Sequence, residues 1–267
     1  MRIKVSILSI VILAVVASAA VLRAQPPEAQ ESQLWMFWDV VVHPSNVAAY
    51  EEVVKKEVEL YTKYEFPFPW STSSTFDGHY YYGIPIDNYG MMEEVIKALD
   101  ETQKKMGEQY TALEAEFEGL IDSMEIQVWT MSADFSYQPE NPRLTAEEEK
   151  YFEWVFIYYK LDAGEKLQEI ISKWKGVYQS KNVTDRYTTW VGDIGTEMPV
   201  HCYNFGAKSA VDYHTRAAEL EKTIGPETGK LWAELSKHVR KIDTKSGFTR
   251  PELSMIAFSE RQPTTAQ

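Results

Sequence analysis

Cysteine and basic residues are scarce in this sequence. Cys202 is the only cysteine among 267 residues, so no intrachain disulfide can form and the fold must depend on its apolar core. Lys and Arg total 27 against 40 Asp and Glu, which gives a formal net charge of −13. Such a negative surface disfavours binding to nucleic acid and to anionic membranes. Also missing are a nucleophile elbow, a phosphate-binding loop, paired cysteines and a dinucleotide fingerprint, so no local motif assigns a reaction.

The N-terminus has the pattern of an export signal. Arg2 and Lys4 precede the apolar run 5–16, and small residues follow at 17–20. We expect a signal peptide over 1–24 whose removal leaves an exported protein, periplasmic or secreted. The alternative is a segment that is retained as a membrane anchor. Residues 25–33, polar and with two prolines, are expected to form a tether.

What the chain does contain is an internal repeat. The apolar strand pattern at 34–42 is followed by a helical pattern, and the same order recurs from 151. Adding 117 to the residue numbers of the first helix superposes its apolar stripe on that of the second. The matched pairs are Tyr50 with Leu167, Val53 with Ile170, Val54 with Ile171 and Tyr61 with Tyr178.

The repeat continues with two more strands in each half. Residues 69–78 and 185–195 are rich in threonine and aromatics, and the next strands begin at His79 and near His201, an offset of 122. We expect a long helix over 91–120, because Leu99, Met106, Leu113 and Leu120 recur every seven residues. The matching helix is expected to break at 225–229. The closing strands are placed at 124–131 and 252–260.

Each half therefore has the order β-α-β-β-α-β, which predicts an α+β protein with helices on one face of an antiparallel sheet. The other sheet face is apolar and must be covered, so we expect the two sheets to pack face to face. The predicted boundaries are repeat 1 at 34–135, a linker at 136–149, repeat 2 at 150–261 and a tail at 262–267.

This pattern resembles the dimeric α/β-barrel superfamily of tandem ferredoxin-like repeats, in its fused two-repeat form. The superfamily includes cofactor-free monooxygenases, small-molecule isomerases, stress-response proteins and haem proteins of the chlorite dismutase type, and no motif selects one branch. The resemblance implies a small-molecule cavity between sheet and helices or inside the barrel. It also implies that the third strand and second helix of each half line this cavity, which points to His79, Tyr81, His201, Tyr203 and His214.

Histidine followed two residues later by tyrosine places both side chains on one face of a strand, where they can act as an acid–base pair. His79 with Tyr81 and His201 with Tyr203 are thus the candidate catalytic pairs, and the alternative is strand-edge histidines with structural hydrogen bonds. His214 is a candidate ligand only if haem is bound. Glu234 and His238 form half of a metal site at most, so no metal is expected.

Three functions remain open at this point. The first is binding, with or without turnover, of a small hydrophobic or aromatic molecule without a cofactor. The second is a non-catalytic module with a filled core, in which the 91–120 helix joins copies into a homo-oligomer. The third is haem binding. The sequence leaves open whether the protein is an enzyme.

Overall fold

The computed structural model describes residues 31–255. The signal-peptide prediction, most of the tether and the tail fall on residues outside this range. Within it, none of the helices combines the length and apolar character needed to span a bilayer.

The N-terminal repeat contains four strands and three helices. It begins with a strand, a helix and two further antiparallel strands. Two consecutive helices and a long closing strand follow. The elements are β1 Gln33–Val42, α1 Val47–Lys63, β2 Ser71–Thr75, β3 His79–Ile86, α2 Gly90–Met106, α3 Glu108–Phe117 and β4 Ile121–Tyr137.

The C-terminal repeat follows the same order with one helix fewer. Its elements are β5 Tyr151–Tyr159, α4 Gly164–Ser180, β6 Tyr187–Gly192, β7 Val200–Ala207, α5 Ala210–Leu235 and β8 Val239–Thr249. Ser209 caps α5, since its side chain accepts a hydrogen bond from the Asp212 backbone N–H.

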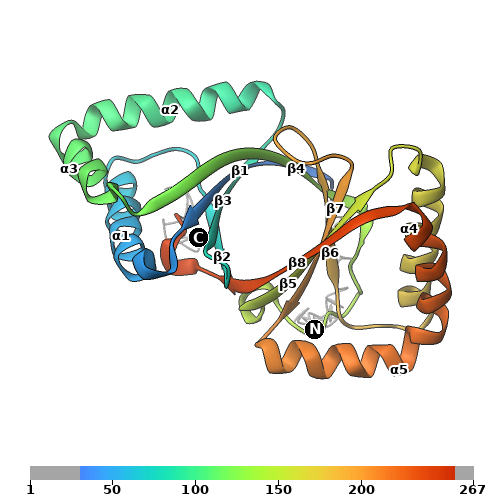
Figure 1. Ribbon diagram of the computed structural model, residues 1–267. Coiled ribbons are helices and arrows are strands. Elements are labelled where there is room, and N and C mark those ends of the chain that lie inside the picture. Colours follow the sequence, from blue (N-terminus) through green and yellow to red (C-terminus); the bar gives the residue numbers. More distant parts are fainter. Residues whose placement is uncertain (1–30, 256–267) are drawn as a thin grey trace, which may run out of the picture. The chain divides into compact units, whose positions relative to one another are not determined.

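The eight strands close into one antiparallel barrel in the order β1-β3-β2-β8-β5-β7-β6-β4. Each repeat supplies four neighbouring strands, and the seams between repeats are β2 with β8 and β4 with β6. The α+β prediction of two β-α-β-β-α-β repeats with facing antiparallel sheets is confirmed. Figure 1 shows α1, α2 and α3 on one side of the barrel, and α4 and α5 on the other.

The predicted helix match is confirmed residue by residue. In α1 the buried residues are Tyr50, Val53, Val54 and Tyr61, and in α4 they are Leu167, Ile170, Ile171 and Tyr178. These are the pairs related by 117. The two helices therefore place equivalent faces on equivalent strands, which is the packing expected of a duplicated unit.

The offset of 122 between the third strands is wrong by one residue. In β1–β3 pairing Val40 lies opposite Tyr80, whereas in β5–β7 pairing Ile157, its equivalent, lies opposite His201. The structural equivalent of His201 is thus Tyr80 and not His79. A shift of one residue along a strand moves a side chain to the other face of the sheet, so His79 and His201 face opposite sides.

The expected 91–120 helix is wrong as a single element. It breaks at Gly107, which has φ +56, a conformation that glycine adopts at little cost. The stripe packs within the chain: Met106 is 3% and Leu113 is 5% exposed. Both pack on the N-terminal repeat, so the stripe is not free to join copies.

Two expectations in the C-terminal repeat are also wrong. The α5 helix runs unbroken through Pro226, because a single proline removes only one backbone hydrogen bond and the flanking Ile224 and Thr228 are buried. The closing strand is β8, residues 239–249, where the expectation was 252–260. Most of β8 is exposed, so it lacks the apolar alternation that reveals a strand in a sequence.

Candidate functional site: the barrel interior

A cavity of about 440 Å³ occupies the inside of the barrel. All eight strands contribute to its wall through alternate residues, because side chains on a strand point to opposite faces in turn. Its volume falls within the range of small-molecule pockets, which is roughly 300–1,000 Å³. The aromatics line the barrel without filling it, so the filled-core alternative does not match the structure.

Eight of the 23 residues that line the cavity are aromatic, and the others include polar and charged side chains. The aromatic rings form edge-to-face contacts, such as Trp35 with Trp190 at 5.7 Å and Tyr81 with Trp154 at 5.0 Å between ring centroids. Such contacts fix the orientation of the rings and leave flat apolar surfaces toward the cavity. The lining aromatics are Trp35, Phe37, Tyr81, Trp129, Trp154, Phe156, Tyr158 and Trp190.

Three buried polar atoms of this wall make no hydrogen bond within the described part of the chain. They are the indole Nε1 of Trp35, the indole Nε1 of Trp154 and the side-chain Oδ1 of Asn204. Trp154 and Asn204 are direct cross-strand neighbours on β5 and β7, and Trp35 is on β1, opposite β5 in the barrel order. The three residues thus line one cavity, and their unpaired atoms, two donors and one acceptor, are buried in its wall.

An ionisable cluster lies where β1 and β3 pair. The Asp39 Oδ1 atom is 2.7 Å from His79 Nδ1, although the residues are 40 apart in the sequence. The His79 ring stacks on Tyr81 at 5.8 Å. Burial and the Asp39 charge raise the pKa of Tyr81, so its hydroxyl stays protonated at neutral pH and can donate a hydrogen bond.

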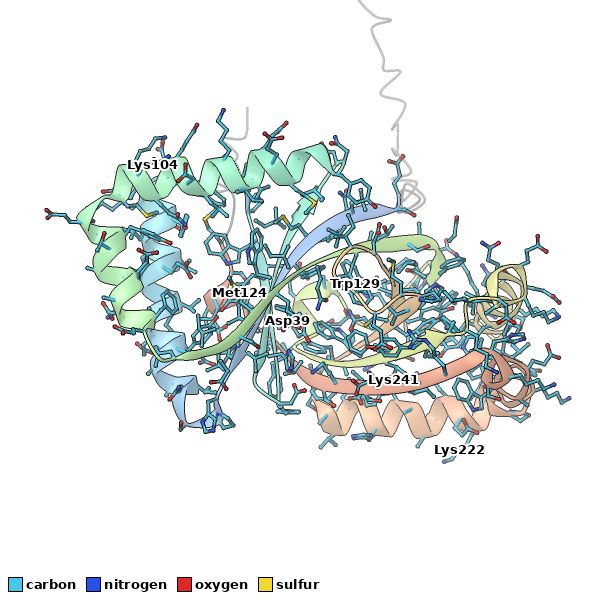
Figure 2. The ribbon with its side chains drawn as sticks, turned by 45° about the horizontal axis from the view of Figure 1, so that its top comes forward. Asp39, Lys104, Met124, Trp129, Lys222 and Lys241 are labelled. Carbon is cyan, nitrogen blue, oxygen red and sulfur yellow. The ribbon has the colours of Figure 1, made fainter. Side chains whose placement is uncertain are left out.

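Asp39 and Tyr81 belong to the cavity wall, and His79, on the same face of β3 as Tyr81, contacts both of them. Figure 2 labels Asp39 of β1 and Trp129 of the neighbouring strand β4. On the other side of His79, its Nε2 atom lies 3.8 Å from Asp77 Oδ2. A histidine oriented by a carboxylate beside a protonated phenol is an arrangement that can move a proton.

The predicted pair His201 and Tyr203 is not in this site. Both side chains face the helices of the C-terminal repeat, where His201 stacks on Phe135 at 5.3 Å. Burial lowers the pKa of His201 to about 4, so its imidazole is neutral at physiological pH. The sequence therefore identified two functional candidates, His79 with Tyr81 and His201 with Tyr203, that the fold separates.

The residues described do not fit a haem at the position the resemblance implied. His214 is exposed on α5 and packs its ring on Tyr213. The cavity between α4, α5 and the sheet has about 200 Å³, below the usual range for drug-sized ligands, and no histidine lines it. Among residues 31–255, no group of three or more His, Cys, Asp or Glu side chains could hold a metal ion.

Cys202 also lines the barrel, and burial raises the pKa of its thiol well above the usual value. A neutral thiol is a poor nucleophile. The candidate groups that the sequence did not reveal are the Asp39 carboxylate and the unpaired groups of Trp35, Trp154 and Asn204. Alternation along a strand shows which residues share a face. It assigns these residues to the inner face of the barrel only when the strand register is known.

No protein-family model matches this sequence, and no curated protein matches it either. Solved structures do resemble it. A protein from Lactobacillus acidophilus that is assigned as a monooxygenase has a TM-score of 0.50 and 9% identity, over 85% of this chain and 97% of that one. An anthrone oxidase-like protein has a TM-score of 0.51 and 10% identity, over 83% and 93%.

A double mutant of chlorite dismutase from Candidatus Nitrospira defluvii has a TM-score of 0.51 and 9% identity, over 84% of this chain and 94% of that one. Identities this low show a shared fold and nothing finer. Together with the closed eight-stranded barrel, they show that the chain has the dimeric α/β-barrel fold, with both ferredoxin-like repeats in one polypeptide.

Proposed function

We propose that the protein is exported and that it binds a small planar aromatic molecule inside its barrel. One observation carries the proposal of a ligand: the three residues whose buried polar atoms are unpaired, Trp35, Trp154 and Asn204, all line the same cavity. Leaving a buried donor or acceptor without a partner costs about 1–3 kcal/mol. A ring with a hydroxyl or carbonyl oxygen would accept from an indole N–H, and a hydroxyl would also donate to Asn204.

The probe that tests this is 2-naphthol, with 2-methylnaphthalene as a ligand of the same shape that cannot form hydrogen bonds. Calorimetric titration should show 2-naphthol binding to the wild-type protein more tightly than 2-methylnaphthalene. Asn204→Leu removes the acceptor and keeps a side chain of similar size, so we expect affinity for 2-naphthol to fall roughly five- to tenfold.

The matched control is Trp174→Phe, which alters the separate cavity under α4. It should leave 2-naphthol affinity unchanged. If Asn204→Leu and Trp174→Phe bind alike, the ligand is not in the barrel. If 2-naphthol does not bind at all, the proposal fails.

A second function, proton transfer on the bound molecule, is favoured by the 2.7 Å contact of Asp39 with His79 beside Tyr81. In this proposal His79 and Tyr81 are the catalytic residues, and His201 and Tyr203 are not near the ligand. The exchange of the ring hydrogen next to the 2-naphthol hydroxyl with solvent deuterium, followed by NMR, reports such transfer. His79→Ala should abolish any protein-dependent exchange, and His201→Ala should not.

A further inference from the structure

A second cavity, of about 470 Å³, lies in the N-terminal repeat between the outer face of the sheet and the helices α1, α2 and α3. It is separate from the barrel interior, because the strand residues that line it alternate with those that line the barrel and point to the opposite face of the sheet. Trp38 and Tyr82 line it, whereas their neighbours Phe37 and Tyr81 line the barrel. Met124, labelled in Figure 2, marks its β4 side.

The charges on the wall of this cavity have one sign. Glu57 of α1 and Glu114 of α3 both line it, and among residues 31–255 no Lys, Arg or His does. Burial raises the pKa of Glu57 to about 7. Burial is the only cause, so no neighbouring cation offsets the cost of ionising this carboxyl.

Four tyrosine side chains line the same cavity as the Glu57 carboxyl. The charge of Glu57 helps to raise the pKa of all four, although burial is the larger cause, so all lie within electrostatic reach: Tyr50, Tyr61, Tyr82 and Tyr110. The hydroxyls of Tyr50 and Tyr82 bond to one another at 2.7 Å, and Gln103 Nε2 donates to the Tyr61 hydroxyl at 2.8 Å. These bonds hold the rings in place.

We infer that this cavity binds a small organic ammonium cation, with Glu57 as its counter-ion and the aromatic rings as its box. Ring faces attract a cation, and the attraction reaches about 2 kcal/mol or more once the cation is removed from water. A buried carboxylate without a partner gains further from a cation of opposite charge in the same enclosure. The aromatic rings and the carboxylate together favour a ligand that carries both a positive charge and an apolar surface.

The C-terminal repeat provides an internal comparison. The 117-residue offset that superposes α1 on α4 places Trp174 at the position of Glu57. Trp174 lines a cavity of only about 200 Å³, and the described residues of its wall are apolar or tyrosine side chains without a carboxylate. The larger volume and the acidic group are thus specific to the N-terminal repeat, and are not requirements of the fold.

The ionisation of Glu57 sets a pH dependence. The titratable groups that face it are the tyrosines of α1, β3 and α3 and the Glu114 carboxyl, while α2 contributes Gln103, β1 contributes Trp38 and β4 contributes Met124. The tyrosines stay protonated near neutrality because their pKa values are raised. Binding of a permanent cation should therefore strengthen about tenfold between pH 6 and pH 8, as Glu57 loses its proton.

Choline and its uncharged isostere 3,3-dimethyl-1-butanol test the inference, because they differ in charge and hardly in shape. Calorimetry on the wild-type protein should show choline binding at pH 8, weaker choline binding at pH 6, and little affinity for the isostere. Glu57→Gln should weaken choline at pH 8 at least tenfold and abolish its pH dependence. The matched variant Glu59→Gln, on the exposed face of the same helix, should behave as the wild type.

Equal affinity for the two probes would overturn the inference, as would unchanged choline binding in Glu57→Gln. A pH dependence that persists in Glu57→Gln would assign the charge to Glu114 and also contradict it. The Asn204→Leu variant keeps this experiment independent of the barrel proposal, since it should affect 2-naphthol and leave choline alone. Circular dichroism of each variant checks that the fold is intact.

Discussion

Replacing His201 by phenylalanine should remove a defined part of the acid sensitivity of the protein. His201 is 6% exposed, between Phe135 and Tyr159, with ring centroids 5.3 and 5.1 Å away. Burial lowers its pKa from 6.5 to about 4, so the folded state holds the neutral imidazole while the unfolded state takes up a proton below pH 6.5. Above pH 6.5 both states hold the neutral imidazole, and the fold has its full stability with respect to this group. As pH falls towards 4, proton uptake by the unfolded state lowers the free energy of unfolding.

The magnitude follows from the size of the shift. Each pKa unit corresponds to 1.36 kcal/mol, so a shift of this size is worth about 3 kcal/mol in the free energy of unfolding. Urea titrations at intervals from pH 4 to pH 8 measure that free energy. The difference between wild type and His201→Phe should shift by about 3 kcal/mol against the wild type as pH falls from 7 to 4.

Phe135→Leu is the matched control, because it disturbs the same packing without removing a titratable group. Its difference from the wild type should not depend on pH over this range. The reasoning is refuted if the His201→Phe difference is flat between pH 4 and pH 7, or if Phe135→Leu reproduces its pH dependence.

Two further predictions concern the barrel seam and the N-terminal cavity. At Gly247 an added Cβ would lie 1.9 Å from the Ser74 carbonyl oxygen on the β2–β8 seam. Gly247→Ala should therefore lower the free energy of unfolding, measured by urea titration, by about 3 kcal/mol or more. The control Gly229→Ala, where an added Cβ in α5 meets open space, should raise it by up to about 1 kcal/mol. Below pH 4.5 the Glu57 carboxyl is protonated in both the folded and the unfolded state, and its burial lowers the stability of the fold as pH rises from there through about 7. Glu57→Gln should therefore be more stable than wild type at pH 8 by about 2 to 3 kcal/mol and show no such gain at pH 5 in the same titration.

The fold could be predicted because a duplicated chain supplies its own comparison. The apolar stripes of α1 and α4 agree at an offset of 117, and the buried residues of the two helices are the ones that this offset pairs. A helical stripe tolerates small errors, because several residues in each turn face the core. The strand register does not, since an error of one residue reverses the face of every side chain. An error of this kind, in the offset of 122, is what made His79 and His201 look like equivalent positions.

The site could be predicted only in part, because barrel closure brings together residues that carry no local signal. Asp39 and His79 meet because β1 pairs with β3, and the Asn204 amide neighbours Trp154 because β7 pairs with β5. The strand β8 was not predicted because its side chains are mostly exposed, although it forms one of the two seams between the repeats. The hydrogen-bonding state of a buried indole depends on all its neighbours, and a sequence cannot supply these.

The unpaired polar groups are not scattered through the described structure. The three buried polar atoms without partners all lie on the barrel wall, and the carboxyl whose pKa burial raises to about 7 lies on the wall of the adjoining cavity. Each lowers the stability of the fold, and a tryptophan stands at the position of Glu57 in the other repeat. Groups that cost stability are typically retained where function requires them. Since β1 and β3 form a wall of both cavities with alternate residues, one sheet holds an aromatic site on its inner face and an acidic site on its outer face.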